Sequence, residues 1–183
     1  TGRGAALGVL VKSGEALQAA GSAGVVVFDK TGTLTHGRPE LTELVRAPGV
    51  RLSEDELLAL AAGAESRSEH PLAQAVLSAA AARQIDIPAP QSFQAVPGRG
   101  VEALIPGSLG IAHALRLGNA EFAGPEFATG PLSAEVARLA DAGATPLCLS
   151  VDGQPGAILA VADTLRPESR GVLDALRRQG VRA

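Results

Sequence analysis

The sequence contains no tryptophan, tyrosine or methionine, and its only aromatic residues are four phenylalanines. The hydrophobic core must therefore be built from alanine, valine and leucine, whose small side chains favour close approach of helices to a sheet. A basic stripe is also absent, because 16 basic and 19 acidic residues are interspersed and give a net charge of −3. Without a basic surface or an aromatic platform, we expect no binding to nucleic acid.

Cysteine and long apolar runs are equally scarce. Cys148 is the single cysteine, which excludes an internal disulfide, and its apolar neighbours predict a buried side chain. No run approaches the ~18 apolar residues of a membrane-spanning helix, and no secretory signal is recognisable. These features predict a soluble, cytosolic chain, whose 183 residues are enough for one large domain or two small ones.

The first part of the chain predicts a parallel α/β sheet. Residues 25–28 are four consecutive apolar residues that end abruptly at Asp29. A strand without polar alternation is typical of a parallel sheet buried on both faces, in which reactive groups collect at the carboxyl ends of strands. A short strand, a glycine turn and a helical turn are expected before it, over residues 8–17.

The middle of the chain predicts an α+β domain. A capping box at Ser53–Glu56 opens a helix over residues 57–64, and Pro71 opens a second helix over residues 71–83. The polar residues 36–39 are interpreted as a turn. Further elements are expected as strands at 93–96, 101–105 and 111–117, a helix at 133–142, and a hairpin of 147–151 with 157–161.

The last residues return to an α/β pattern. Pro167 is expected to begin a helix that runs to Gln179, and Val181 to begin another strand. The order of elements predicts an α/β domain formed by residues 1–38 and 162–183. It is interrupted by an inserted α+β domain, residues 39–161, with an antiparallel sheet flanked by helices.

Residues 29–35 read Asp-Lys-Thr-Gly-Thr-Leu-Thr and contain the candidate catalytic group, the carboxylate of Asp29. A carboxylate that accepts a phosphoryl group needs in-line access and nearby cations and donors. Lys30 and a Mg²⁺ ion would supply positive charge, although Lys30 could point away and contact phosphate only through its backbone N–H. Gly32 would let backbone N–H groups face the phosphate, and Thr31 offers a hydroxyl.

This heptapeptide after an apolar run resembles the phosphorylation signature of the P-type ATPases, a branch of the haloacid-dehalogenase-like (Rossmann-type) fold group. The resemblance implies that Asp29 accepts the γ-phosphate of ATP, assisted by Lys30 and Thr31, with Asp29 and Thr31 contributing to a Mg²⁺ site. Phosphatases of this fold group carry a second Asp where Thr31 stands. Because threonine cannot deprotonate water at neutral pH, a phosphorylated Asp29 should persist, which favours a pump over a soluble phosphatase.

A second resemblance lies in residues 68–72, Ser-Glu-His-Pro-Leu, which are similar to the nucleotide-domain signature of the heavy-metal branch of P-type ATPases. It implies that His70 and Glu65 contact the adenine of ATP. A histidine directly before a helix-opening proline is, by itself, more often a helix cap.

Two glycine motifs extend the resemblance. Gly98 and Gly100 match a Gly-x-Gly that lets the backbone pass close to the nucleotide, and Val101 adds an apolar contact. Arg99 between them is interpreted as facing solvent or touching phosphate. Gly118 and Asn119 match a Gly-Asn pair beside the ribose and phosphates, although Asn119 could merely cap a turn.

The small size of the inserted segment and the absence of a Lys-Gly-Ala motif favour the heavy-metal branch, with Cu⁺ as the favoured cargo and Zn²⁺ or Cd²⁺ open. Later signatures of the phosphorylation domain, Thr-Gly-Asp and Gly-Asp-Gly-x-Asn-Asp, do not occur. The chain is therefore expected to be a cytosolic fragment of an integral membrane pump. It should bind ATP or ADP weakly, lack turnover by itself, and dimerise through an open sheet edge. The alternatives are a soluble phosphatase and a non-catalytic nucleotide-binding module.

Overall fold

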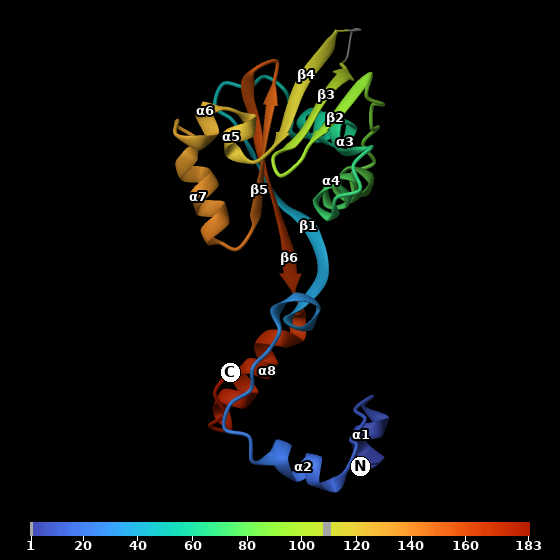
Figure 1. Ribbon diagram of the computed structural model, residues 1–183, viewed down its shortest axis with the longest axis vertical. Coiled ribbons are helices and arrows are strands. Elements are labelled where there is room, and N and C mark those ends of the chain that lie inside the picture. Colours follow the sequence, from blue (N-terminus) through green and yellow to red (C-terminus); the bar gives the residue numbers. More distant parts are fainter. Residues whose placement is uncertain (1, 108–110) are drawn as a thin grey trace. The chain divides into compact units, whose positions relative to one another are not determined.

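The computed structural model describes residues 2–107 and 111–183. The chain forms two compact units, each with its own contacts (Figure 1). The smaller unit combines the residues up to His36 with Leu165–Ala183, and the larger unit is Gly37–Thr164. The larger unit thus interrupts the smaller one in sequence.

The larger unit is built on a six-stranded sheet in the order β1-β6-β5-β4-β3-β2. Neighbouring strands from β2 to β6 pair antiparallel, which confirms the predicted antiparallel sheet and the β5–β6 hairpin. The strands are β1 (Thr35–Arg46), β2 (Ser92–Val96), β3 (Gly100–Pro106), β4 (Ala112–Gly118), β5 (Thr145–Val151) and β6 (Gln154–Leu165).

Two helices, α3 (Glu54–Glu65) and α4 (Pro71–Ala82), cover one face of this sheet (Figure 1). The predicted capping box is present, because the Ser53 side chain accepts from the Glu56 N–H and the Glu56 carboxylate accepts from the Ser53 N–H. In β3–β6, alternate residues point into the core beneath these helices. The fully buried side chains of this core include Leu57, Leu58, Val76, Ile105, Leu117, Leu149 and Leu159.

The opposite face is covered over β5 and β6 by three short helices, α5 (Ala120–Ala123), α6 (Pro125–Ala128) and α7 (Ser133–Asp141). Phe127, Cys148 and Ile158 form the centre of this second core. Burial raises the pKa of the Cys148 thiol to about 12, so this cysteine is an inert core residue, as the sequence predicted.

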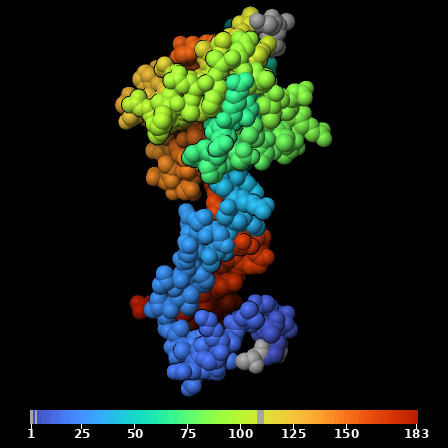
Figure 2. All heavy atoms as spheres, turned by 45° about the vertical axis from the view of Figure 1, so that its right-hand side comes forward, coloured from blue at the N-terminus to red at the C-terminus, as the bar shows by residue number. Residues whose placement is uncertain are grey.

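The smaller unit contains α1 (Gly2–Ala6), α2 (Gly14–Gly21), a π-type turn η1 (Lys30–Leu34) and α8 (Pro167–Arg178). The prediction of a buried strand over residues 25–28 is wrong, because the only pairing of these residues is a single parallel bridge between Val25 and Arg182. Val27 is 90% exposed. It belongs to the N-terminal part of the chain, which is drawn in blue in Figure 2. A parallel strand is buried only when neighbouring strands and helices cover it, and the described residues supply one bridging partner. The strand expected to begin at Val181 is also absent, and Arg182 forms only this bridge with Val25.

Two further expectations differ from the structure, and two short helices were not expected. The strand expected near residues 8–11 is absent, although the helical turn that follows it is α2, capped by the Ser13 side chain. The turn expected at 36–39 is instead the start of β1, because pairing with β6, a distant strand, overrides the local turn signal. Helices α5 and α6 were not predicted, since four residues are too short to show a helical period.

Candidate nucleotide and phosphate-acceptor sites

A cavity of about 390 Å³ lies in the larger unit on the face covered by α3 and α4. It is enclosed by the α3–α4 connection, the β2–β3 turn, the end of β4 and the start of β5. The structure brings together here all seven residues that the sequence assigned to nucleotide binding: Glu65, His70, Gly98, Gly100, Val101, Gly118 and Asn119.

Glu65, the last residue of α3, supplies the most unusual group in this cavity. Its side chain is 6% exposed, and its Oε2 atom has no hydrogen-bond partner. Burial raises the pKa of Glu65, and the nearby Ser68 hydroxyl and His70 partly oppose that rise. A buried carboxylate oxygen without a donor destabilises the fold by roughly 1–3 kcal/mol, so its presence points to a ligand that donates a hydrogen bond.

His70 acts as the N-cap of α4. Its Nδ1 atom accepts a hydrogen bond from the Leu72 N–H at 3.2 Å. A neutral ring whose Nδ1 accepts carries its proton on Nε2. The capping role and the ligand role predicted for His70 are therefore compatible, because the cap leaves an Nε2–H donor at the cavity.

Two of the glycines have a structural reason in the fold itself, besides the nucleotide contact inferred from sequence. Gly100 on β3 lies opposite Gly118 on β4. A Cβ added to Gly100 would lie 2.6 Å from the Gly118 Cα, and one added to Gly118 would lie 2.7 Å from the Gly100 Cα. These two glycines therefore permit close approach of two strands. Gly98 has a φ of +71°, a conformation that favours glycine, and its Cβ would meet no neighbour.

Asn119 braces the turn at the cavity. Its Oδ1 accepts from the Phe122 N–H at 2.9 Å and caps α5, while its Nδ2 donates to the Gly98 carbonyl at 3.3 Å. Its backbone N–H donates to the Arg99 carbonyl at 2.9 Å. The capping alternative raised from sequence is thus observed, and this residue shapes the cavity wall.

The sequence interpretation missed one wall of the cavity, Thr145–Leu147 at the start of β5. These three residues carry no recognisable local motif. They reach the site only because β5 pairs with β4, and that long-range pairing cannot be seen from sequence spacing.

The predicted phosphate acceptor, Asp29, lies in the smaller unit and is exposed, as are Lys30 and Thr31. The loop after it is closed by the buried Thr35, whose hydroxyl accepts from the Gly32 N–H and donates to the Lys30 carbonyl, each at 3.1 Å. Gly32 has a φ of +77°, which explains why glycine stands at this tight turn.

Residues that follow β6 fix this loop from the other side. The Arg166 Nε donates to the Thr35 carbonyl at 3.0 Å, and the buried Ser169 hydroxyl donates to the Leu34 carbonyl at 2.7 Å. The Arg166 backbone N–H also donates to the Leu34 carbonyl, at 2.8 Å. Asp29 is thereby presented on a loop whose backbone is held by many hydrogen bonds.

The described residues contain no group of three or more His, Cys, Asp or Glu side chains that could hold a metal ion. Of the two Mg²⁺ ligands predicted from sequence, Asp29 supplies a hard carboxylate oxygen, the donor type that Mg²⁺ prefers. The described residues therefore fit a magnesium ion only in part.

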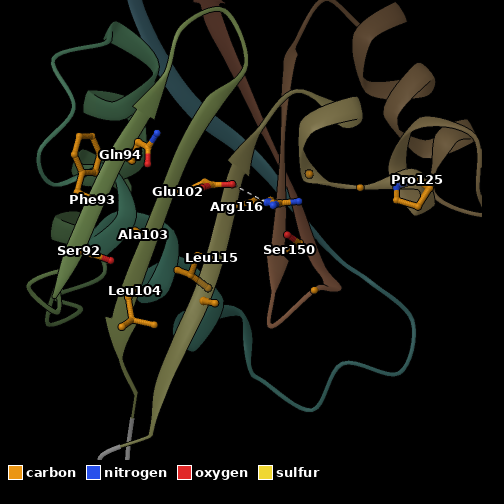
Figure 3. Close-up of a pocket in the computed structure, with 14 residues that line it drawn as sticks. Ser92, Phe93, Gln94, Glu102, Ala103, Leu104, Leu115, Arg116, Pro125 and Ser150 are labelled. Atoms are coloured by element: carbon orange, nitrogen blue, oxygen red, sulfur yellow. Dashed lines mark hydrogen bonds and ion pairs between the residues drawn. The ribbon is translucent and has the colours of Figure 1, made fainter.

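A larger hollow of about 650 Å³ lies on the opposite face of the sheet, over β2–β5 beside α5 and α6 (Figure 3). Its charged groups already pair with each other, since the Glu102 Oε1 accepts from the Arg116 Nε at 2.9 Å. Arg116 also lies 5.9 Å from the centre of the Phe122 ring. The smaller cavity, with its unpartnered carboxylate, is therefore the better candidate for a ligand.

Comparison with known proteins gives a consistent result. The haloacid dehalogenase-like hydrolase family matches residues 23–183. The chain is 41% identical over 182 residues to copper-transporting ATPase 1 of Rhizobium meliloti (strain 1021), covering 100% of this chain and 21% of that protein. It is also 36% identical over 183 residues to a probable copper-exporting P-type ATPase of Archaeoglobus fulgidus, covering 99% of this chain and 21% of that protein. The chain thus spans about a fifth of these relatives.

Solved structures show the same similarity. A zinc-transporting PIB-type ATPase in its E2.Pi state matches with a TM-score of 0.81 and 34% identity, over 94% of this chain and 27% of that one. The N-domain of HMA6, a copper-transporting P-type ATPase, matches with a TM-score of 0.51 and 28% identity, over 68% of this chain and 98% of that one. The resemblance to P-type ATPases predicted from the sequence is confirmed.

Proposed function

Because this chain belongs to the haloacid dehalogenase-like hydrolase family, we propose that it is the ATP-binding and phosphate-accepting part of a heavy-metal cation pump. The observation that supports this most strongly is the unpartnered Glu65 carboxylate in a cavity of nucleotide size. Cu⁺ is the favoured cargo, since several relatives are named as copper transporters. Zn²⁺ is the second candidate, because one similar solved structure is named as a zinc transporter, and Cd²⁺ is the third. No helix among residues 2–107 and 111–183 is long and apolar enough to span a membrane. We place the chain in the cytosol, as one part of an integral membrane protein.

Nucleotide binding follows from the groups that line the cavity. The adenine amino group would donate to the Glu65 Oε2 and remove the penalty of its missing partner. The His70 Nε2–H would donate a second hydrogen bond, from the protein to a ring nitrogen of the base. Val101 and Leu147 add buried apolar surface against the ring.

Phosphoryl transfer is assigned to Asp29. One carboxylate oxygen forms a bond to the γ-phosphorus, the bond from that phosphorus to the β–γ bridging oxygen breaks, and ADP leaves. The Lys30 ammonium offsets negative charge, and Mg²⁺, when bound beside Asp29 and Thr31, supplies further positive charge. The Thr31 hydroxyl cannot act as a base toward water, so the aspartyl-phosphate persists long enough to drive a conformational change.

Titration of the 183-residue chain with ATP tests the binding part of this proposal. We expect weak, saturable binding that the Glu65→Gln variant weakens about tenfold, because the amide is a poorer acceptor for the amino group. Glu69→Gln, at an exposed neighbour, should bind like the parent. Absence of binding at millimolar ATP, or strong hydrolysis by this chain alone, would contradict the proposal.

The transfer step is tested in the longer protein. A radiolabelled γ-phosphate should be trapped on Asp29, and Asp29→Asn should abolish both the label and metal transport. A soluble phosphatase would instead show rapid loss of label, and a non-catalytic nucleotide-binding module would keep its physiological role in Asp29→Asn. Label on a different residue would exclude the assignment.

A further inference from the structure

The cavity that contains Glu65 has charged side chains of opposite sign on different walls. Glu65 comes from the end of α3, whereas Arg99 comes from the β2–β3 turn. Among the described lining residues, Arg99 is the only lysine or arginine, and it is exposed. The salt bridges of the described residues do not include Arg99, which distinguishes it from the paired Arg83, Arg116 and Arg138.

The backbone of Arg99 is held in place. Its N–H donates to the Val96 carbonyl at 3.0 Å, and its carbonyl accepts from the Asn119 N–H at 2.9 Å. The preceding carbonyl, that of Gly98, accepts from the Asn119 side chain. A side chain on such a fixed turn loses less conformational entropy on binding a ligand than one on a loose loop.

The two walls together fit a ligand with a hydrogen-bond donor on a ring at one end and negative charge at the other. A guanidinium group suits phosphate because its planar N–H groups can bond two phosphate oxygens at once. We propose that Arg99 binds the phosphates of the nucleotide and orients it, with the base toward Glu65. This inference rests on the proposed function of the cavity and adds a specificity-determining residue to it.

The role proposed for Arg99 predicts that this residue affects the binding of nucleotides but not of nucleosides. Adenosine carries the base and ribose but no phosphate, so its affinity should not depend on Arg99. AMP and ADP carry phosphate and should depend on it. The Glu65 side chain, by contrast, should affect all three ligands, because all three carry the same amino group.

The experiment measures binding of adenosine, AMP and ADP to the whole chain by ligand-detected or chemical-shift NMR titration, without magnesium. Arg99→Gln should weaken AMP and ADP about five- to tenfold and leave adenosine unchanged, while Arg99→Lys should retain part of the affinity. The ADP affinity of the parent should fall with added salt more steeply than that of Arg99→Gln. The matched control is Arg51→Gln, at an exposed arginine of the same unit outside the cavity lining.

The outcomes separate this inference from the proposed function. Failure of the parent chain to bind adenosine or ADP would contradict nucleotide binding itself. Binding by the parent with equal ADP affinity in Arg99→Gln would overturn the role of Arg99 alone. An equal loss of adenosine and ADP binding in Arg99→Gln would also overturn it, because that pattern indicates a damaged turn.

Discussion

At the scale of single residues, the Glu65 carboxylate lowers the stability of the fold and is also the proposed ligand contact. Its carboxylate is buried at the end of α3 with one oxygen unpartnered, so the folded state tolerates a group that would be better solvated in the unfolded chain. Such a group is retained where a ligand needs it, and its removal is expected to stabilise the protein while weakening ligand binding.

This trade-off gives a prediction on pH. Burial raises the pKa of Glu65 above its ordinary value of 4.5, so the charged form destabilises the fold. The stability associated with the protonated group is complete below pH 4.5 and is lost as pH rises through the folded pKa. At pH 7, Glu65→Gln should therefore raise the free energy of unfolding by roughly 1 kcal/mol, and the gain should shrink toward pH 4.

Chemical denaturation at several pH values without nucleotide measures this difference. Glu69→Gln is the control, because that side chain is exposed and should leave the free energy of unfolding unchanged within about 0.5 kcal/mol. A destabilised Glu65→Gln protein at pH 7 would mean that the carboxylate has a stabilising partner.

Single residues also hold the loop of residues 30–34, which follows the proposed phosphate acceptor Asp29. Thr35 and Ser169 are both buried, and their hydroxyls bond backbone groups of residues 30–34. Neither hydroxyl is needed for phosphate chemistry in the proposed mechanism. Their contribution is to hold the backbone of residues 30–34, which directly follow the exposed Asp29.

At the scale of elements, the contact between β3 and β4 controls the shape of the cavity. Gly100→Ala would place a methyl group against the backbone of Gly118, and neither strand can move without breaking its ladder. We expect a loss of about 3 kcal/mol or more in the free energy of unfolding, because rigid backbone cannot relax around an extra methyl group.

The matched control for this prediction is Gly171→Ala, at a helical glycine in α8 whose Cβ would meet no neighbour. That substitution should stabilise α8 by about 0.5–1 kcal/mol, as expected for alanine in a helix. Thermal unfolding followed by circular dichroism distinguishes the two substitutions. Equal stability of Gly100→Ala and the parent would show that the strands can separate at this point.

Elements with strong local signals were predicted well. The prolines at 71 and 167 are the first residues of α4 and α8, as predicted, and the capping box at Ser53 precedes α3, which begins at Glu54, three residues before the predicted start at 57. Strands β2–β6 were also located. In contrast, residues 25–28 have a composition typical of a strand but only one bridging partner. The start of β1 was interpreted as a turn because it contains turn-forming residues.

At the scale of the whole molecule, the proposed nucleotide site and the proposed phosphate acceptor lie in different units. Every residue that lines the candidate nucleotide cavity lies within the larger unit, and so do both hydrophobic clusters. The larger unit therefore has its own core and its own proposed ligand site. The smaller unit contains Asp29 and exposes apolar side chains such as Leu10, Val27 and Leu165.

This division predicts that a protein of residues 37–164 folds alone and binds ADP with the affinity of the full chain, within about twofold. Circular dichroism and ADP titration of the two proteins make the comparison. The N-domain of HMA6, which matches 68% of this chain, supports the expectation of independent folding. A tenfold weaker affinity in the shorter protein would show that the smaller unit contributes to nucleotide binding. Dimerisation through an open sheet edge stays a prediction, which sedimentation of the full chain can test.

The sequence by itself determined what depends on neighbouring residues: helix starts, the hairpin, the acceptor motif and the likeness to P-type ATPases. These follow from local hydrogen bonding and from short motifs that can be read without knowing the fold. Only the tertiary structure decided which partners long-range pairing provides. It placed Thr145–Leu147 in the cavity wall, set Gly100 against Gly118, left the Glu65 Oε2 without a donor, and left residues 25–28 uncovered. The physical reason is that burial and strand pairing depend on two segments that are distant in sequence. Their energies therefore cannot be inferred from either segment alone.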